Sequence, residues 1–199
     1  FRVWLSKGQN FLSEEFTIDN ILKDDFNPKA DRYEGEFRDN RKHGYGVFET
    51  NKSVYKGNFE KGYRKGIGTL TTQDGIIYEG QFNNEFPDGK GKIVYDDGTS
   101  YEGDFKNGIR EGYGKISFVT GEVYEGQVVN GQREGQGIVK RKSGEVHYEG
   151  TWKNDTWHGK GTVHSTDGKT YTGDFNNGIK QGHGKLINPT GVIYEGMFE

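Results

Sequence analysis

Large apolar side chains recur along this chain at a fixed interval, and polar residues and glycines fill the positions between them. A tyrosine opens each copy of the pattern, 22 to 24 residues after the one before: Tyr33, Tyr55, Tyr78, Tyr101, Tyr124, Tyr148, Tyr171 and Tyr194. A second ring follows four residues later in seven copies: Phe37, Phe59, Phe82, Phe105, Trp152, Phe175 and Phe198. Self-similarity at one period is typical of a repeat array, so we expect one structural repeat per copy.

Each copy has the pattern of a β-hairpin. Over residues 101–105, alternation places the tyrosine, glycine and phenylalanine on one side of a strand and Glu102 and Asp104 on the other. A turn rich in glycine and asparagine follows, and a second short strand is predicted over 115–119. No stretch within 33–199 has a helical period, so the array is predicted to be all-β.

The glycines keep the register of the tyrosines. One glycine follows each opening tyrosine by two residues, where it leaves room for large rings and for a closely approaching strand. A Gly-x-Gly pair begins eleven residues after the tyrosine and predicts a tight reversal, because glycine adopts positive φ angles at little cost. Stacked hairpins of this kind predict an elongated single-layer antiparallel sheet, twisted and curved, with the rings on one face and glutamates on the other.

Residues 1–30 lack the repeat, whereas 31–199 hold seven full copies and the start of an eighth. Four apolar residues of the first segment share one face of a predicted short helix: Ile18, Ile21, Leu22 and Phe26. Such a segment would either cap the first hairpins or dock a partner. The chain begins at Phe1 rather than Met and stops within a copy, so we expect it to be a fragment of a longer protein.

Some copies depart from the pattern, and we expect chain-specific features there. Three residues replace the glycine found elsewhere seven residues after the tyrosine: Asn40, Glu85 and Asp155. Val128 replaces the second ring of the fifth copy, which leaves a shallower spot that is either a site for a partner side chain or simply tolerated. Phe86 and Trp157 are predicted at turn tips, where each would contact a partner or fold back over the neighbouring hairpin.

The composition suits a thin structure built on regularly placed rings. Apolar residues make up 30% of the chain and the mean hydropathy is −0.97, yet aromatic residues reach 14%. The net charge of −3 gives no general attraction for nucleic acid. The lack of cysteine excludes a disulfide scaffold and a thiol nucleophile and fits a reducing compartment. No apolar run approaches the roughly 18 residues that a membrane helix needs.

No motif assembles a catalytic, metal or cofactor site. The five histidines include no pair at a metal-ligand spacing. The Gly-x-Gly pairs lack the following helix and the Gly-Lys-Ser/Thr sequence of phosphate-binding loops. We therefore predict no enzyme activity, no cofactor and no metal ligand.

The motif Tyr-Glu-Gly-x-Phe-x-x-Gly-x-x-x-Gly-x-Gly, intact over 101–114, resembles the MORN repeat (membrane occupation and recognition nexus). The resemblance covers about 33–199 in seven tandem copies. It implies a single-layer sheet of hairpins with a groove, and a scaffold or docking module rather than a catalyst. Families with such repeats include radial-spoke head proteins of cilia and junctophilins at membrane junctions. The resemblance therefore implies a cytoplasmic protein associated with the cytoskeleton or a cilium, with membrane association as the alternative.

We expect the ring-bearing face to bind an extended or helical segment of a partner polypeptide, of a cytoskeletal or axonemal kind. The candidate groove residues are Tyr55, Phe59, Tyr78, Phe82, Tyr101, Phe105, Tyr124, Tyr148, Trp152, Tyr171 and Phe175. Each ring buries about 150–250 Å², so two to three copies would supply the roughly 800 Å² of a standard interface. Self-association through an edge strand or the groove is a further alternative.

Basic residues suggest a second role, as a peripheral membrane tether. Nine residues after the opening tyrosine, five of the seven copies carry a base: Lys42, Arg64, Arg110, Arg133 and Lys180. At one sheet edge these would form a row of cations about 10 Å apart, which suits the phosphates of anionic lipids. Only the first two turns are clearly basic, so the candidate lipid contacts are Arg41, Lys42, Arg64 and Lys65. Such a short row predicts weak recruitment, and we favour protein docking.

Overall fold

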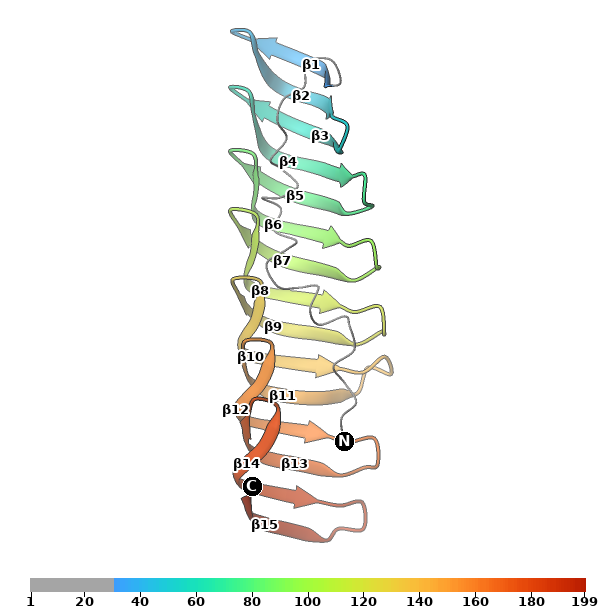
Figure 1. The fold of residues 1–199 in the computed structure, drawn as a ribbon, viewed down its shortest axis with the longest axis vertical. Helices are drawn as coiled ribbons and strands as arrows, with labels where there is room; N and C mark the ends of the chain where they lie inside the picture. The colour runs from blue at the N-terminus through green and yellow to red at the C-terminus, as the bar shows by residue number, and fades with distance from the viewer. Residues whose placement is uncertain (1–30) are drawn as a thin grey trace. The chain divides into compact units, whose positions relative to one another are not determined.

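The computed structural model describes residues 31–199, which form fifteen β-strands and no helix (Figure 1). The predicted helical segment within 1–30 lies outside the described residues. In the part of the chain that is described, no helix has the length and hydropathy needed to cross a bilayer. The chain divides into two compact units, which we call unit 1 (1–112) and unit 2 (113–199).

Unit 1 is an open, single-layer antiparallel sheet in which each strand pairs with its neighbours in the sequence. Its strands are β1 (Arg32–Arg38), β2 (Arg41–Glu49), β3 (Ser53–Glu60), β4 (Tyr63–Thr72), β5 (Ile77–Asn83), β6 (Phe86–Val94) and β7 (Ser100–Lys106). Strand β8 (Ile109–Ser117) crosses the division between the units. No helix or second sheet covers either face among these strands, which confirms the predicted single layer.

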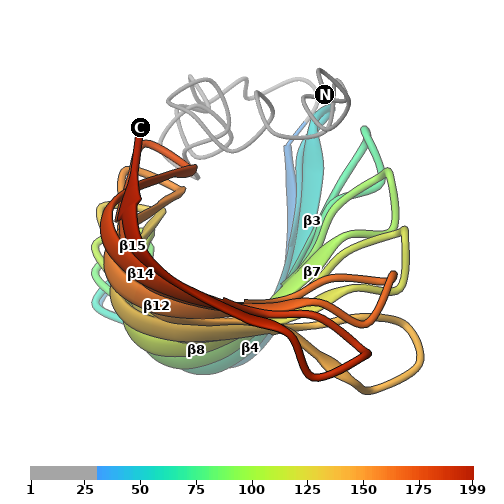
Figure 2. The ribbon, with the colours of Figure 1, turned by 90° about the horizontal axis from the view of Figure 1, so that it is seen from below.

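Unit 2 repeats the same architecture. After the end of β8 it contains β9 (Val123–Val129), β10 (Gln132–Lys140), β11 (Val146–Lys153), β12 (Thr156–His164), β13 (Thr170–Asn176), β14 (Ile179–Ile187) and β15 (Ile193–Phe198). These strands are again antiparallel and paired in chain order. In both units the strands are bent, so that each sheet is curved rather than flat (Figure 2).

The full copies within each unit form the predicted hairpins. In the second copy, the opening Tyr55 on β3 lies opposite Leu70 on β4, and Gly57 lies opposite Gly68. Lys61 and Gly62 turn the chain between these strands with φ angles of 53° and 97°. Two consecutive residues with positive φ make the turn whose twist matches that of the flanking strands. The predicted use of asparagine and glycine at the turn is confirmed at Asn107 and Gly108 of the fourth copy. The expectation that the Gly-x-Gly pair makes the reversal is wrong, because the second strand begins before it: β8 starts at Ile109 rather than at 115, so Gly112 and Gly114 are strand residues.

The glycines two and thirteen residues after each tyrosine form one continuous file within each unit. In unit 1 the members of the file are Gly35, Gly46, Gly57, Gly68, Gly80, Gly91 and Gly103, each opposite the next. In unit 2 they are Gly126, Gly137, Gly150, Gly161, Gly173, Gly184 and Gly196. No other residue type interrupts either file, so the middle of each sheet is bare backbone on which large side chains can lie.

Candidate functional site: the aromatic face

The opening tyrosines and the second rings lie on one face of the sheet, which we call the aromatic face. In the six inner copies, the opening tyrosine exposes no more than 1% of its surface: Tyr55, Tyr78, Tyr101, Tyr124, Tyr148 and Tyr171. Tyr55 meets Phe59 of its own copy and Phe82 of the next, edge to face, with centroid separations of 5.1 and 5.0 Å. The same zigzag continues in unit 2, where Tyr171 meets Phe175 and Phe198 at 5.2 and 4.8 Å. The rings therefore form the core of each unit.

The file of glycines is the floor on which the tyrosine rings lie. A Cβ atom added to Gly173 would stand 2.5 Å from the hydroxyl of Tyr171 and 2.6 Å from the Cα of Gly184, closer than real Cβ atoms come. The prediction that these glycines leave room for a ring and for a neighbouring strand is thus confirmed, because a single added Cβ atom would collide with both. In every copy the tyrosine hydroxyl donates to the backbone carbonyl three residues later, at 2.7 to 3.2 Å. These bonds satisfy the polar end of each buried ring.

Burial shifts the ionisation of these phenols. Desolvation raises the pKa of Tyr101 and of Tyr148 to about 12. It also raises the pKa of Tyr55, Tyr78 and Tyr124. A charged phenolate is disfavoured in such a site because it would lose its hydration.

In six of the seven full copies the residue nine positions after the opening tyrosine lies over that ring, and in the third copy this position is the buried Pro87, opposite Phe82; we call these seven the covering residues. They are Lys42, Arg64, Pro87, Arg110, Arg133, Trp157 and Lys180. The guanidinium carbons of Arg64 and Arg110 lie 5.2 and 5.5 Å from the ring centroids of Tyr55 and Tyr101. These are cation–π distances, which are most favourable where the cation is partly desolvated.

The other covering residues use different chemistry for the same contact. Trp157 stacks flat on Tyr148, with centroids 4.5 Å apart and an interplanar angle of 6°. The ammonium of Lys180 lies 4.9 Å from the ring of Tyr171, and desolvation lowers the pKa of this lysine. Pro87 is fully buried. The position thus tolerates any side chain that can lie over a ring.

Two carboxylates pair with covering arginines of the preceding copy. Asp155 lies 2.9 Å from Nε of Arg133, and Glu85 lies 3.5 Å from Nε of Arg64. Each carboxylate also accepts a hydrogen bond from the backbone amide of the same arginine. Asp155 and Glu85 adopt positive φ angles of 65° and 81°, which glycine adopts without strain in other copies. These departures from glycine are therefore explained by an ion pair between successive copies.

The fifth copy contains an extra residue. The register between β10 and β11 shifts by a bulge, and His147 lies against the edge of Trp157 with centroids 5.4 Å apart. The Arg141 guanidinium lies 2.8 Å from Nδ1 of His147, and it also donates to the carbonyl of His164. Burial lowers the pKa of His147.

The burial of the rings corrects one part of the groove prediction. We expected the rings themselves to be open to a partner, but these eleven expose between 0 and 4% of their surface: Tyr55, Phe59, Tyr78, Phe82, Tyr101, Phe105, Tyr124, Tyr148, Trp152, Tyr171 and Phe175. The sequence correctly placed the rings on one face of the sheet and missed that the covering residues lie over them. Val128 is also fully buried, so no open spot lies above it.

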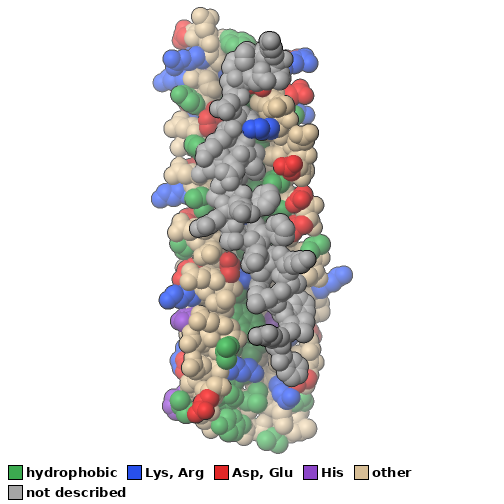
Figure 3. All heavy atoms as spheres, viewed as in Figure 1, with side chains coloured by type: hydrophobic (Ala, Val, Ile, Leu, Met, Phe, Trp, Pro, Cys, Tyr) green, Lys and Arg blue, Asp and Glu red, His purple; other side chains and the backbone are tan. Residues whose placement is uncertain are grey.

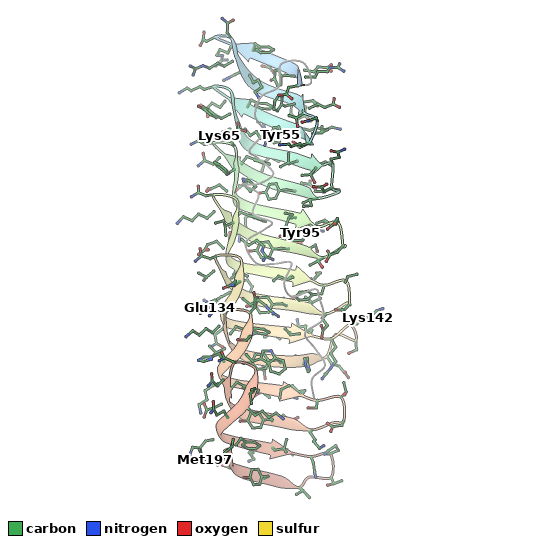
Figure 4. The ribbon with its side chains drawn as sticks, viewed as in Figure 1. Tyr55, Lys65, Tyr95, Glu134, Lys142 and Met197 are labelled. Atoms are coloured by element: carbon green, nitrogen blue, oxygen red, sulfur yellow. The ribbon has the colours of Figure 1, made fainter. Side chains whose placement is uncertain are left out.

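The turn and lipid predictions change for the same reason. Trp157 is half-buried against Tyr148 and Phe86 is half-buried, so Trp157 folds back instead of standing at an open turn tip. Arg64 exposes only 3% of its surface, and the Lys42 ammonium lies 3.6 Å from the ring centroid of Phe48. The expected row of cations at a sheet edge is therefore wrong for these two. Arg41 and Lys65 are exposed, and Lys65 lies at the edge formed by the turns within copies (Figure 4).

The face opposite the aromatic face carries a hollow in unit 2. This hollow of about 470 Å³ is lined by Lys160, Gly161, Thr162, Thr172, Gly173, His183, Gly184, Lys185 and Glu195. Its lysines are already engaged, since Lys160 and Lys185 pair with Asp174 and Glu195 at 2.8 and 3.7 Å. Over residues 31–199, no cluster of three histidine, aspartate or glutamate side chains is placed to hold a metal ion. Basic and acidic side chains are interspersed along the sides of the molecule in Figure 3.

Comparison with known proteins agrees with this architecture. The family model of the MORN repeat matches residues 33–51, 55–77, 78–100, 101–123, 124–146, 148–170 and 171–193. These matches cover well over half of the chain, and the chain belongs to the MORN-repeat family. Among curated proteins, none matches it in sequence.

Solved structures offer more distant likenesses. The TCP domain of SAS-4 (dCPAP) from Drosophila melanogaster, in complex with a proline-rich motif of Ana2 (dSTIL), is 12% identical with a TM-score of 0.50. That match covers 84% of this chain and 90% of the other. A point mutant of the TCP10 domain of Danio rerio CPAP is 16% identical over 86% of this chain and 97% of its own, with a TM-score of 0.26. At this identity the likeness to the Drosophila TCP domain shows a shared fold and nothing further.

Proposed function

We propose that this chain is a non-enzymatic scaffold that binds a segment of a partner polypeptide along its aromatic face, in a cytoskeletal or ciliary assembly. Membership in the MORN-repeat family fits a protein-binding scaffold. The TCP domain that shares its fold was solved with a proline-rich motif of another protein, which supports an extended segment as the partner. The cytoskeletal setting rests on these relatives alone.

One observation carries the proposal: a constant frame presents a variable side chain at one position of every copy. The frame consists of the tyrosine, its paired glycines and, in all copies but one, the second ring. The covering position changes from lysine to arginine, proline and tryptophan. Adjacent copies lie about 10 Å apart, so the covering residues form a row with a fixed spacing. Repeat proteins recognise extended partners with surfaces of this kind.

The proposed contacts are made by the covering residues, with the rings as their support. Trp157 and Lys180 are the best placed in unit 2, because both are half-buried and both lie on rings. A tryptophan held flat on Tyr148 offers a large rigid surface at little entropic cost. The candidate rings Tyr148, Trp152 and Phe175 surround Trp157 and hold it in place.

The test compares matched substitutions on the two faces of unit 2. Trp157→Ala and Lys180→Glu change the aromatic face, whereas Tyr113→Ala and Lys160→Glu remove an aromatic ring and reverse a lysine charge on the opposite face. Proximity labelling in cells that express each full-length variant would identify the partners. We expect Trp157→Ala to weaken capture of the principal partner by about 30-fold, as for an interface hot spot. Equal loss with both members of a pair, or loss with the opposite-face variants only, would refute the proposal.

A further inference from the structure

The row of covering residues in unit 2 contains one indole whose outer face its ring neighbours leave open. Trp157 lies flat on Tyr148, with ring centroids 4.5 Å apart. Trp152 stands nearly at right angles to both, 5.3 Å from Tyr148 and 6.4 Å from Trp157. Phe175 does the same at 5.5 and 5.7 Å. A ring on the outer face of Trp157 would lie much farther from Tyr148 than from Trp157, so these two rings stand beside the stack. The half-buried Trp157 therefore keeps its outer face for a ligand.

The polar atom of the same indole is also available. The indole N–H of the buried Trp152 donates to the carbonyl of Gly137 at 3.2 Å. Over residues 31–199, by contrast, the indole N–H of Trp157 has no acceptor, and it is not an atom sealed from solvent. A tryptophan N–H usually finds a hydrogen-bond partner when it becomes buried. A ligand that covers Trp157 should therefore bring a carbonyl oxygen to this N–H.

The electrostatics around Trp157 suit a ligand without charge. Arg133, the covering residue of the preceding copy, is already paired with Asp155 at 2.9 Å. Lys180, the covering residue of the following copy, has charges of both signs near it, from Asp167 and Lys169. The complementary ligand is therefore a neutral segment that combines apolar rings with accessible carbonyls. Proline-rich segments in the polyproline II conformation have both, since their backbone makes no internal hydrogen bonds and their proline rings pack on aromatic side chains.

The polyproline II helix also matches the repeat of the array. It has three residues per turn and a rise of about 3.1 Å, so every third residue returns to the same edge after about 9.3 Å. Successive copies of this chain are two strands apart, or about 9.6 Å. An α-helix returns to one face after seven residues, about 10.5 Å, and a strand after two residues, about 6.8 Å. Of these three conformations, polyproline II therefore has the repeat nearest to that of the array.

We propose that the aromatic face of unit 2 binds a proline-rich segment in the polyproline II conformation, which runs along the array with one turn per copy. A proline ring packs on the outer face of Trp157, and a backbone carbonyl of the segment accepts the indole N–H. The residues three positions before and after that proline lie over Arg133 and Lys180. Trp157 is the one aromatic residue among the seven covering residues, so it fixes the register of the segment. The inference rests on the proposed function, because it names the class of partner for the same face.

The test measures fluorescence anisotropy of labelled, capped ten-residue peptides that bind to the full chain. We expect a peptide of ten prolines to bind at least tenfold more tightly than a flexible peptide of alternating glycine and serine. Two further peptides carry three glutamines each. Glutamines at peptide positions 2, 5 and 8 leave two edges of the helix entirely proline, whereas glutamines at positions 4, 5 and 6 interrupt all three edges. The first should bind at least fivefold more tightly than the second, and equal affinities would overturn the proposal.

Variants of the protein locate the binding. Trp157→Ala and Trp157→Arg should each weaken binding of the ten-proline peptide at least tenfold. Arginine is the covering residue of three other copies, so Trp157→Arg keeps the row closed if alanine perturbs the fold. Trp157→Phe, which keeps a ring but lacks the N–H, should weaken binding by about fivefold. Tyr113→Ala, on the opposite face, should leave it unchanged.

Two results would contradict this inference. Undiminished binding of the ten-proline peptide by Trp157→Arg would place the peptide elsewhere and overturn the proposal. If no proline peptide binds while Trp157→Ala still abolishes capture of the cellular partner, this inference fails while the proposed function stands.

Discussion

Unit 1 and unit 2 have the same frame but cover it differently. In unit 1, three of the four covering residues are cations on tyrosine rings. In unit 2, Trp157 takes the place of a cation, Val128 takes the place of a ring, and an extra residue enters at His147. The opening tyrosines of the six inner copies, Tyr55 to Tyr171, nevertheless remain fully buried in both units. The comparison shows which positions are required for folding and which are free to vary.

The frame is strict because several contacts converge on a few atoms. The tyrosine ring needs glycine beneath it, the next copy's ring at its edge and a carbonyl for its hydroxyl. The position of the covering residues tolerates variation because any flat or extended side chain can lie over a ring. Where Val128 removes one ring, Arg133 leans over Trp152 of the next copy at 4.3 Å and keeps the stack closed. Variation on a fixed frame is what a recognition surface requires.

The largest expected effect comes from removing an opening ring. Tyr78→Ala in unit 1 and Tyr171→Ala in unit 2 should each reduce the free energy of unfolding by about 3–5 kcal/mol, as for other buried aromatics. Tyr45→Ala, whose ring is 60% exposed, should change it by less than about 0.5 kcal/mol. Urea denaturation followed by circular dichroism gives these values. If either unit tolerates the loss of its tyrosine, the two frames are not equivalent.

The next effect comes from filling the glycine file. Gly80→Ala and Gly173→Ala should each cost about 3 kcal/mol, because the new methyl group meets both a tyrosine hydroxyl and a backbone Cα. Gly98→Asn is the matched turn variant, since this glycine has a φ of 86° with open space around it and asparagine tolerates such angles. It should cost less than about 1 kcal/mol. Equal losses at the file and at the turn would contradict the role of the file as a floor for the rings.

The inter-copy ion pairs should differ between the units. Asp155→Gly should cost about 2 kcal/mol, because it leaves Arg133 buried without its carboxylate. Glu85→Gly should cost about 1 kcal/mol, because its carboxylate is farther from Arg64 and more exposed. Glycine adopts a positive φ without strain, so both variants also remove backbone strain. The change in thermal unfolding temperature of each variant therefore reports mainly the loss of its carboxylate. If Asp155→Gly raised the stability, the strain of the positive φ at Asp155 would cost more than its ion pair with Arg133 contributes.

A last effect appears only at high pH. The pKa values of Tyr101 and Tyr148 rise to about 12, whereas an unfolded tyrosine ionises near pH 10. The unfolded chain therefore releases these protons first, and the stabilisation is complete below pH 10 and is lost as the pH rises to about 12. Each such tyrosine should lower the free energy of unfolding by about 1.4 kcal/mol per pH unit in this window. Tyrosinate absorbance and circular dichroism should change together, and ionisation of all tyrosines near pH 10 without unfolding would exclude this burial.

The sequence predicted the frame well because the frame is periodic. Tyrosine, glycine and the second ring each recur at one offset, and alternation along a strand assigns them to one face. The hairpins and the single layer followed from this spacing, whereas the turn lies before the Gly-x-Gly pair that was expected to form it. The position of the file of glycines beneath the rings also followed, since the reason for a glycine in a strand is close approach.

The role of the covering residues could not be predicted in the same way, because the residue type at their position is not constant. Lysine, arginine, proline and tryptophan share no class, so the covering position looked like a charged turn with exceptions. A signal was nevertheless present, since every one of these side chains packs well on an aromatic ring. For Glu85 and Asp155, the sequence likewise showed only that they replace a glycine found in other copies, and it did not show their ion pairs. Their partners lie 21 and 22 residues away, and only the stacking of successive copies brings them together.

Covalent labelling of tyrosines in the full-length folded protein tests the central claim most directly, because the chain carries exposed and buried tyrosines of the same chemistry. The account predicts fast modification of Tyr45, Tyr63 and Tyr113, which expose 54–62% of their surface. It predicts protection of at least tenfold for the opening tyrosines of both units, from Tyr55 to Tyr171. Modification of these opening tyrosines at the rate of Tyr45 would show that the rings are not the core, and would contradict the account.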